Sequence, residues 1–145
     1  MSGHYSIIEA RFYSDITEAL AEGAEAELKA IDATYERIFV PGVLEIPAAL
    51  SMIVNSGRSR FDGHILLGCV IRGETSHYDI VANESARSIM SLIAEKSLAV
   101  GNGILTVENR DQAWARARKK EKNKGGAAAK AAIKMADLRQ QFGFE

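Results

Sequence analysis

The segment from Gly68 to Asp79 holds the residues whose types and spacing best suit chemistry. A nearly uninterrupted apolar run, residues 65–71, leads into a polar turn at residues 73–76 and then into a helical pattern. Backbone N–H groups at a helix start are unpaired and carry the positive end of the helix dipole, so they stabilise an anion such as phosphate. Thr75 and Ser76 can add hydroxyl donors; alternatively, one of them only caps the helix and nothing binds there.

His77 stands at the same helix start. An imidazole can both donate and accept protons at neutral pH, which makes His77 a candidate proton shuttle beside a phosphate site. A lone histidine is more often a structural hydrogen-bonding residue, and from the residues alone the two interpretations have about equal weight. His4 and His64 lie too far along the chain to complete a local zinc motif, and Cys69 is the only cysteine.

Two further segments carry candidate ligand-binding residues. Residues 41–47 follow a short strand pattern, and their two prolines and one glycine favour an extended loop that can face a polyhydroxylated ligand. Glu45 is the charged residue of this loop; its simpler role is that of an acid in the first turn of a helix. Phe12, at the end of the first strand pattern, can stack on a flat heterocycle, although most such phenylalanines belong to the core.

Basic residues gather between Arg116 and Lys124, with only Glu121 opposing them. The common meaning of such a run is a solvated helix end. A sharper interpretation is that one or two of these side chains reach an anionic substrate, because arginine can hold phosphate through two parallel hydrogen bonds. A nucleic-acid surface is a weak third interpretation, since Trp114 is the only aromatic residue close to this stretch and the net charge of the chain is −1.

Strand and helix patterns alternate about four times along the chain, which is typical of an open, doubly wound α/β fold with a parallel sheet. In such sheets ligands bind beyond the carboxyl ends of the strands. A capping-box spacing at Asp15 to Glu18 starts the first helix, and its acidic run is interpreted as a solvated face. The expected strands are residues 5–12, 35–40, 65–71 and 98–107, the last broken by Gly101 and Gly103; the expected helices are residues 16–30, 46–54, 77–96, 111–122 and 127–141, with a kink at 123–126.

The bulk composition limits the possible classes of protein. A length of 145 residues with 47% hydrophobic residues suits one domain over residues 1–145. The small net charge gives no reason to expect nucleic acid or an anionic membrane as a partner. A single cysteine favours a reducing compartment, and with no targeting or membrane-spanning pattern we expect a cytoplasmic protein.

Five segments, taken together and in order, resemble the motifs of the lumazine synthase family. They span almost the whole chain, and a series with these intervals is highly specific although each motif alone would be weak. The segments are Arg11-Phe12, Pro41-Gly-Val-Leu-Glu-Ile-Pro47, Gly68-Cys-Val-Ile-Arg-Gly-Glu-Thr-Ser-His77, Gly103-Ile-Leu-Thr-Val-Glu-Asn109 and Asn123-Lys-Gly125.

The resemblance implies a flavodoxin-like three-layer αβα sandwich with a four-stranded parallel sheet. It also implies homopentamers with active sites between neighbouring subunits. By similarity, His77 is the proton shuttle, and the neighbouring subunit contributes Asn102, Lys124 and Arg116. The other implied site residues are Phe12, Val43, Leu44, Glu45, Cys69, Val70 and Ile71 for the pyrimidine and its ribityl chain, and Glu74 and Thr75 for the phosphate.

The implied reaction joins 5-amino-6-(ribitylamino)uracil to 3,4-dihydroxy-2-butanone 4-phosphate and needs no metal or organic cofactor, because proximity supplies much of the acceleration. Leu44 and Asn102 stand where large aromatic residues are common, and Ala127 replaces a frequent acidic residue. We nevertheless expect an active enzyme; the alternative is a non-catalytic lumazine- or flavin-binding protein of the same fold. Charged residues in the kink at 119–126 favour free pentamers over larger shells.

Overall fold

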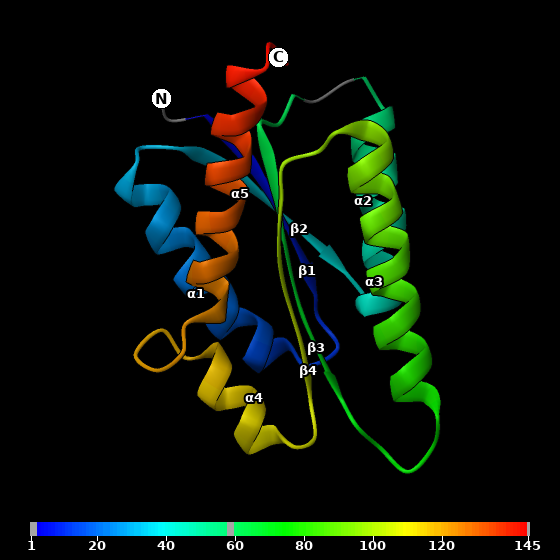
Figure 1. Cartoon of the computed structure of the whole chain (residues 1–145). Coiled ribbons are helices and arrows are strands. Elements are labelled where there is room, and N and C mark those ends of the chain that lie inside the picture. Colours follow the sequence, from blue (N-terminus) through cyan, green and yellow to red (C-terminus); the bar gives the residue numbers. More distant parts are fainter. Residues whose placement is uncertain (1–2, 58–59, 145) are drawn as a thin grey trace.

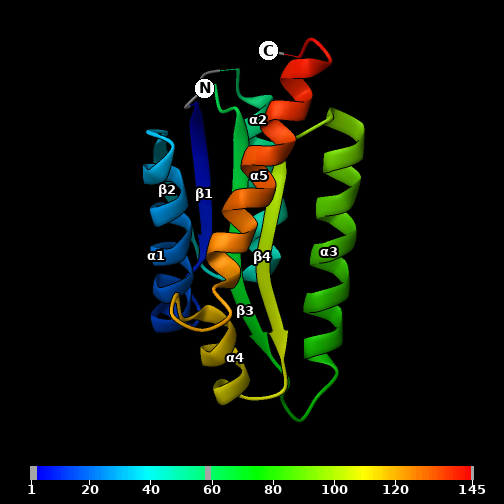
Figure 2. The same ribbon diagram turned by 60° about the vertical axis from the view of Figure 1, so that its left-hand side comes forward.

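Four parallel strands form the centre of the fold. The computed structural model describes residues 3–57 and 60–144. The strands are β1 (His4–Ala10), β2 (Thr34–Val40), β3 (Gly63–Ile71) and β4 (Val100–Val107), and their order in the sheet is β2-β1-β3-β4. All neighbouring strands pair in parallel, so their carboxyl ends meet at one edge of the sheet, the lower edge in Figures 1 and 2.

Helices cover both faces of this sheet (Figure 1). One layer holds α1 (Ser14–Ala30), α4 (Arg110–Ala117) and α5 (Lys124–Gln141), and the other holds the short 3₁₀ helix η1 (Val43–Glu45), α2 (Ile46–Asn55) and α3 (His77–Lys96). This is the α/β sandwich with a four-stranded parallel sheet that the alternating patterns predict. The predicted fold class is therefore confirmed.

The apolar run in β3 is buried because helices pack on both of its faces. Ile65 and Leu67 belong to the core under α1 and α5, whereas Leu66 and Val70 belong to the core under α2 and α3. Side chains alternate between the two faces of a strand, so a strand covered on both sides needs apolar residues at nearly every position.

The prediction that Gly101 and Gly103 break the last strand is wrong. β4 runs through both glycines, and it begins at Val100 rather than at residue 98. A Cβ atom at Gly101 would overlap the carbonyl oxygen of Ala128, and one at Gly103 would lie 3.1 Å from the Ala128 Cβ atom. The two glycines therefore let α5 pack closely on β4 instead of interrupting it.

Three predicted helix boundaries also need correction. No capping box forms at Asp15, because α1 already begins at Ser14 and the carboxylate of Glu18 pairs with arginines instead. The helix expected to reach residue 122 ends at Ala117. The last helix begins at Lys124, three residues earlier than expected, because Asn123 adopts a left-handed conformation and its side chain accepts a hydrogen bond from the backbone N–H of Gly126.

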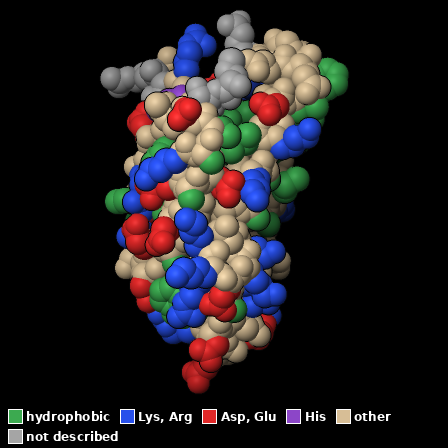
Figure 3. Space-filling view, turned by 90° about the vertical axis from the view of Figure 1, so that its left-hand side faces the viewer, with side chains coloured by type: hydrophobic (Ala, Val, Ile, Leu, Met, Phe, Trp, Pro, Cys, Tyr) green, Lys and Arg blue, Asp and Glu red, His purple; other side chains and the backbone are tan. Residues whose placement is uncertain are grey.

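Charged side chains of both signs cover the layer that carries α1 and α5. Figure 3 shows them intermingled over this side of the molecule, with only small hydrophobic patches between them. A surface covered by charged side chains of both signs is well solvated by water. Within the part of the chain that the structure describes, none of the helices combines the length and apolar character needed to cross a lipid bilayer.

Candidate functional site

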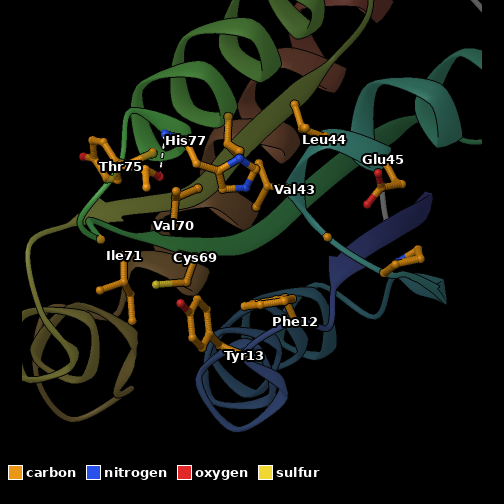
Figure 4. A pocket seen from close by; sticks show the side chains of 15 residues that line it. Phe12, Tyr13, Val43, Leu44, Glu45, Cys69, Val70, Ile71, Thr75 and His77 are labelled. Atoms are coloured by element: carbon orange, nitrogen blue, oxygen red, sulfur yellow. Dashed lines mark hydrogen bonds between the residues drawn. The ribbon is translucent and has the colours of Figure 1, made fainter.

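A cavity of about 430 Å³ lies at the carboxyl edge of the sheet. Three loops and the start of α3 enclose it: the β1–α1 turn, the β2–η1 loop and the β3–α3 turn (Figure 4). Its position agrees with the rule that ligands bind beyond the carboxyl ends of parallel strands. The residues that line it are Phe12, Tyr13, Pro41, Gly42, Val43, Leu44, Glu45, Cys69, Val70, Ile71, Gly73, Thr75, His77, Tyr78 and Val81.

His77 is the first residue of α3, and its imidazole points into this cavity towards Val43 (Figure 4). Its backbone N–H donates to the Thr75 hydroxyl oxygen over 3.3 Å. The N-cap residue Ser76 makes no side-chain capping hydrogen bond. Of the two hydroxyls expected at this helix start, Thr75 both contacts the helix backbone and faces the cavity, so a proton donor or acceptor and the positive end of a 20-residue helix meet there.

The β2–η1 loop and η1 form the wall opposite His77. Val43 is buried against β3, where a Cβ atom at Gly68 would lie only 2.9 Å from the Val43 Cγ2 atom. Gly68 therefore lets this loop approach the strand. Leu44 and Glu45 remain exposed at the mouth, and the backbone N–H of Glu45 donates to the carbonyl oxygen of Gly42 over 3.1 Å.

Phe12 lies in the β1–α1 turn and not in the core. Its side chain is 74% exposed, and its ring meets the ring of Tyr13 edge to face at 4.9 Å. An exposed phenylalanine on the rim of an apolar cavity is available to stack on a flat ligand. Of the two interpretations of Phe12, the core interpretation is therefore wrong, and its role in stacking on a ligand stays a prediction.

The floor of the cavity is apolar and uncharged. Cys69, Val70 and Ile71 end β3 there. Burial is the main cause that raises the pKa of the Cys69 thiol to about 11, so this side chain stays neutral at physiological pH. A neutral buried thiol suits packing against a ligand rather than nucleophilic attack.

An ion-pair cluster around Arg72 lies next to the β3–α3 turn. The guanidinium of Arg72 lies 3.1 Å from the carboxylate of Glu108 after β4 and 3.5 Å from that of Asp79 in α3, and it stacks 4.2 Å from the centre of the Tyr78 ring. These contacts join the ends of β3 and β4 to the first turn of α3. They hold the segment that carries Thr75 and His77.

Comparison with known proteins decides which family this architecture represents. The model of the 6,7-dimethyl-8-ribityllumazine synthase family matches residues 3–140. The chain belongs to the lumazine synthase family. It is 56% identical over 145 residues to 6,7-dimethyl-8-ribityllumazine synthase 1 of Rhizobium meliloti, covering 98% of this chain and 95% of that protein. The synthases of Bartonella henselae and Agrobacterium fabrum are 54% and 53% identical, each over 97% of this chain, covering 90% and 97% of those proteins.

The cavity brings together most of the residues that the resemblance to lumazine synthases singled out. Within one chain, four of them do not line it: Glu74, Asn102, Arg116 and Lys124. Glu74 lies between Gly73 and Thr75, which do line it. The other three lie on β4, α4 and the start of α5; Arg116 donates to the carbonyl oxygen of Gln112, and Asn102 accepts from the backbone N–H of Ile104.

Sequence reasoning missed several residues of this lumazine synthase cavity. Tyr13 and Tyr78 each stand next to a predicted site residue, and both line the cavity. Each is an aromatic residue next to Phe12 or His77 in the sequence, and that adjacency could have identified it. The Arg72 cluster left no such signal, because its partners come from separate elements that only the fold brings together.

Proposed function

We propose that this chain is an active lumazine synthase. It condenses 5-amino-6-(ribitylamino)uracil with 3,4-dihydroxy-2-butanone 4-phosphate to give 6,7-dimethyl-8-ribityllumazine in riboflavin biosynthesis. Close relatives named as lumazine synthases support this function. The observation that carries it is one cavity in which an apolar floor and an exposed aromatic ring face both His77 and the start of α3.

Each part of the cavity suits one part of the substrates. The pyrimidine ring stacks on Phe12 and lies against the apolar end of β3, while the loop at Val43 to Glu45 meets the ribityl chain. The phosphate lies at the start of α3, where the helix dipole and the Thr75 hydroxyl stabilise negative charge. Glu74 acts there through its backbone N–H, because its carboxylate would repel the phosphate.

The reaction needs proton transfers that His77 is placed to make. The exocyclic amine of the pyrimidine attacks the ketone, water is lost as the imine forms, and phosphate leaves. The ribityl-bearing nitrogen then closes the second ring with loss of a second water. His77 relays protons during these steps, and no cofactor is needed because the cavity holds two reactive partners next to each other.

We also propose a homopentamer whose active sites lie between subunits, with Asn102, Arg116 and Lys124 completing a neighbour's site. None of these three residues lines the cavity of its own chain, which supports this. The layer of α2 and α3 exposes large apolar side chains, at Met52, Ile80 and Met90, which are 71%, 54% and 60% exposed. Apolar groups left bare on one layer are typical of an interface.

We place this single-domain enzyme, residues 1–145, in the cytoplasm. The free and buried Cys69 is compatible with a reducing compartment. The formal net charge of −1 gives nucleic acid and anionic membranes no electrostatic attraction to the chain, so its partners are its two small substrates and further copies of itself.

The test of this function is lumazine formation by the purified protein and by the His77→Ala variant. We expect turnover by the wild-type protein and a fall in kcat of roughly 100-fold or more in the variant, with substrate dissociation constants unchanged. Lys134→Ala, on the exposed side of α5, is the control and should keep wild-type turnover.

Two results would count against the proposal. Wild-type protein that binds the pyrimidine tightly but forms no lumazine at millimolar substrates would identify a binding protein without catalysis. Full activity in His77→Ala would leave the enzyme assignment standing but move proton transfer to another group, such as the substrate itself.

A further inference from the structure

We propose that the chain carries a second binding site, for a small organic anion with an apolar body, at the opposite edge of the sheet. A cavity of about 400 Å³ lies there and shares no residue with the first one. It lies between residues 60–62 just before β3, the α3–β4 connection and the end of α5. The last two of these segments lie at the upper end of Figure 1. Its lining residues are Ile53, Val54, Gly57, Arg60, Phe61, Asp62, His64, Leu98, Ala99 and Arg139.

His64 provides a buried polar group in the wall of this cavity. Its side chain is 4% exposed, and its Nδ1 atom lies 2.7 Å from the hydroxyl oxygen of the fully buried Ser6. When the Ser6 hydroxyl donates to Nδ1, the neutral ring carries its hydrogen on Nε2, the nitrogen left to bond a ligand. Burial, aided by the nearby charge of Arg139, lowers the pKa of His64 to about 4, so the ring is a neutral donor.

Two arginines give the cavity its charge. The Nε atom of Arg139 donates to the carbonyl oxygen of Ser97 over 2.6 Å, and its guanidinium stacks 4.9 Å from the centre of the Phe144 ring. These contacts fix the guanidinium at the wall. Arg60 adds a second positive charge. Among the residues that the structure describes, Asp62 is the only acid in the lining, and it accepts a hydrogen bond of 2.8 Å from the backbone N–H of His4.

The remaining walls are apolar and decide what kind of anion fits. Ile53, Val54 and Leu98 contribute aliphatic surface, and Phe61 contributes a ring whose centre lies 5.8 Å from that of His64. An inorganic ion would leave these side chains uncovered. A carboxylate or phosphate monoester on an aryl or short alkyl body covers them, and the volume of the cavity is in the range of small-molecule sites.

The test is a methyl NMR titration of the assembled full-length protein with benzoate and, separately, with phenyl phosphate. Methyl groups of Ile53 and Leu98 report on this cavity, whereas those of Val43 and Val81 report on the first one. We expect saturable shifts at Ile53 and Leu98 with at least one probe. Arg139→Gln should weaken that binding at least tenfold, which is the loss of one charge-assisted hydrogen bond.

Two controls accompany this variant. Arg87→Gln removes one positive charge from an exposed site on α3 and should leave the affinity for the probe unchanged. Arg139→Gln should form lumazine at the wild-type rate. His64→Gln removes the neutral imidazole and tests its contribution to probe binding separately from that of Arg139. Shifts confined to Val43 and Val81, no saturable shift with either probe, or equal binding in wild type and Arg139→Gln would each overturn the proposal.

Discussion

At the scale of single residues, the fully buried carboxylate of Glu9 holds β1 to the turn that carries Phe12. Arg37 donates two hydrogen bonds to it, of 2.7 and 2.8 Å, and Arg11 donates a third of 2.9 Å. The same two arginines also bond the carboxylate of Glu18 in α1. The hydrogen bonds that Arg37 donates to Glu9, ahead of the one that it donates to Glu18, raise the pKa of Arg37. A buried charge is tolerated in the core here because every partner is present.

Replacing Arg37 with glutamine should therefore destabilise the fold strongly. The change leaves the Glu9 carboxylate, at 0% exposure, without its two-pronged partner, and breaking such a buried pair costs about 3 kcal/mol. Urea unfolding at fixed protein concentration measures the loss. Arg87→Gln, which breaks an exposed pair with Glu84, is the control and should leave the unfolding free energy close to that of the wild type, because solvent screens such a pair. Equal losses in the two variants would show that Glu9 does not depend on Arg37.

His64 should make stability fall as the pH drops from about 6.5 towards 4. In the unfolded chain its pKa is 6.5, whereas burial and then Arg139 lower the pKa to about 4 in the folded state. Between those values the unfolded state binds more protons, so acid favours unfolding. The histidine alone should remove roughly 2 kcal/mol of stability between pH 7 and pH 5.

Urea unfolding at the two pH values tests this. His64→Gln should show a smaller difference between pH 7 and pH 5 than the wild type, by about 2 kcal/mol. His77→Gln, an exposed histidine, is the matched control and should keep the wild-type difference. An unchanged difference in His64→Gln would mean that the folded protein admits the proton as readily as the unfolded chain.

At the scale of elements, sequence patterns predict the parts of the fold that depend on local chemistry. The apolar run of β3 and the helical spacing of α3 each depend on neighbouring residues, and both elements form where expected. The bond between Glu9 and Arg37 depends on the register of β1 against β2, which pairs Ile7 with Arg37 and so brings residues 28 apart within reach. No local pattern carries that register.

The same limit applies to glycine. In the sequence, Gly101 and Gly103 read as strand breakers, because the helix that approaches them follows more than 20 residues later. The start of α5 was misplaced for a related reason: Gly125 weakens a helix in isolation, but here it allows close contact with the backbone of Leu20 in α1. Both errors concern packing between elements. Most of the cavity residues, by contrast, lie at or just after strand ends and are predicted by the family motifs; Tyr13 and Tyr78 are not.

Gly101→Ala should separate α5 from β4. The new methyl group would overlap the carbonyl oxygen of Ala128, which is backbone and cannot rotate away, so we expect a loss of about 3 kcal/mol or more in unfolding free energy. Gly73→Ala is the matched control, since nothing lies within 4 Å of a Cβ atom there, and its effect should stay near about 0.5 kcal/mol. Urea unfolding of both variants measures the difference; similar values would contradict the close contact.

At the scale of the whole molecule, the two helical layers differ in the surface that they present. The layer of α1 and α5 is covered mainly by mixed charges (Figure 3), with Met135 and Phe142 exposed on and just after α5, whereas α2 and α3 expose Met52, Ile80 and Met90. Exposed apolar surface gains free energy from being covered by another copy, and α2 and α3 present more of it along their lengths. This asymmetry favours an assembly that joins chains through the α2 and α3 layer and leaves the charged layer in water.

The proposed sharing of each active site between two subunits makes a specific prediction for mixed assemblies. His77→Ala and Arg116→Ala should each be impaired at low dihydroxybutanone phosphate, the first in turnover and the second in phosphate binding. When the two variants are unfolded, mixed equally and refolded, about one interface in four pairs a wild-type His77 with a wild-type Arg116 from its neighbour. Activity per chain should then rise above the mean of the two pure variants, towards a quarter of wild type.

The same preparations decide the size of the assembly. Sedimentation of the wild-type protein should give five times the mass of one chain, and the refolded mixture should match it. A particle of megadalton mass would overturn the free pentamer. If His77 and Arg116 belonged to the site of the same subunit, mixing the two variants would create no intact pair of residues. Activity that only averages the two pure variants would therefore contradict a site completed by the neighbouring subunit.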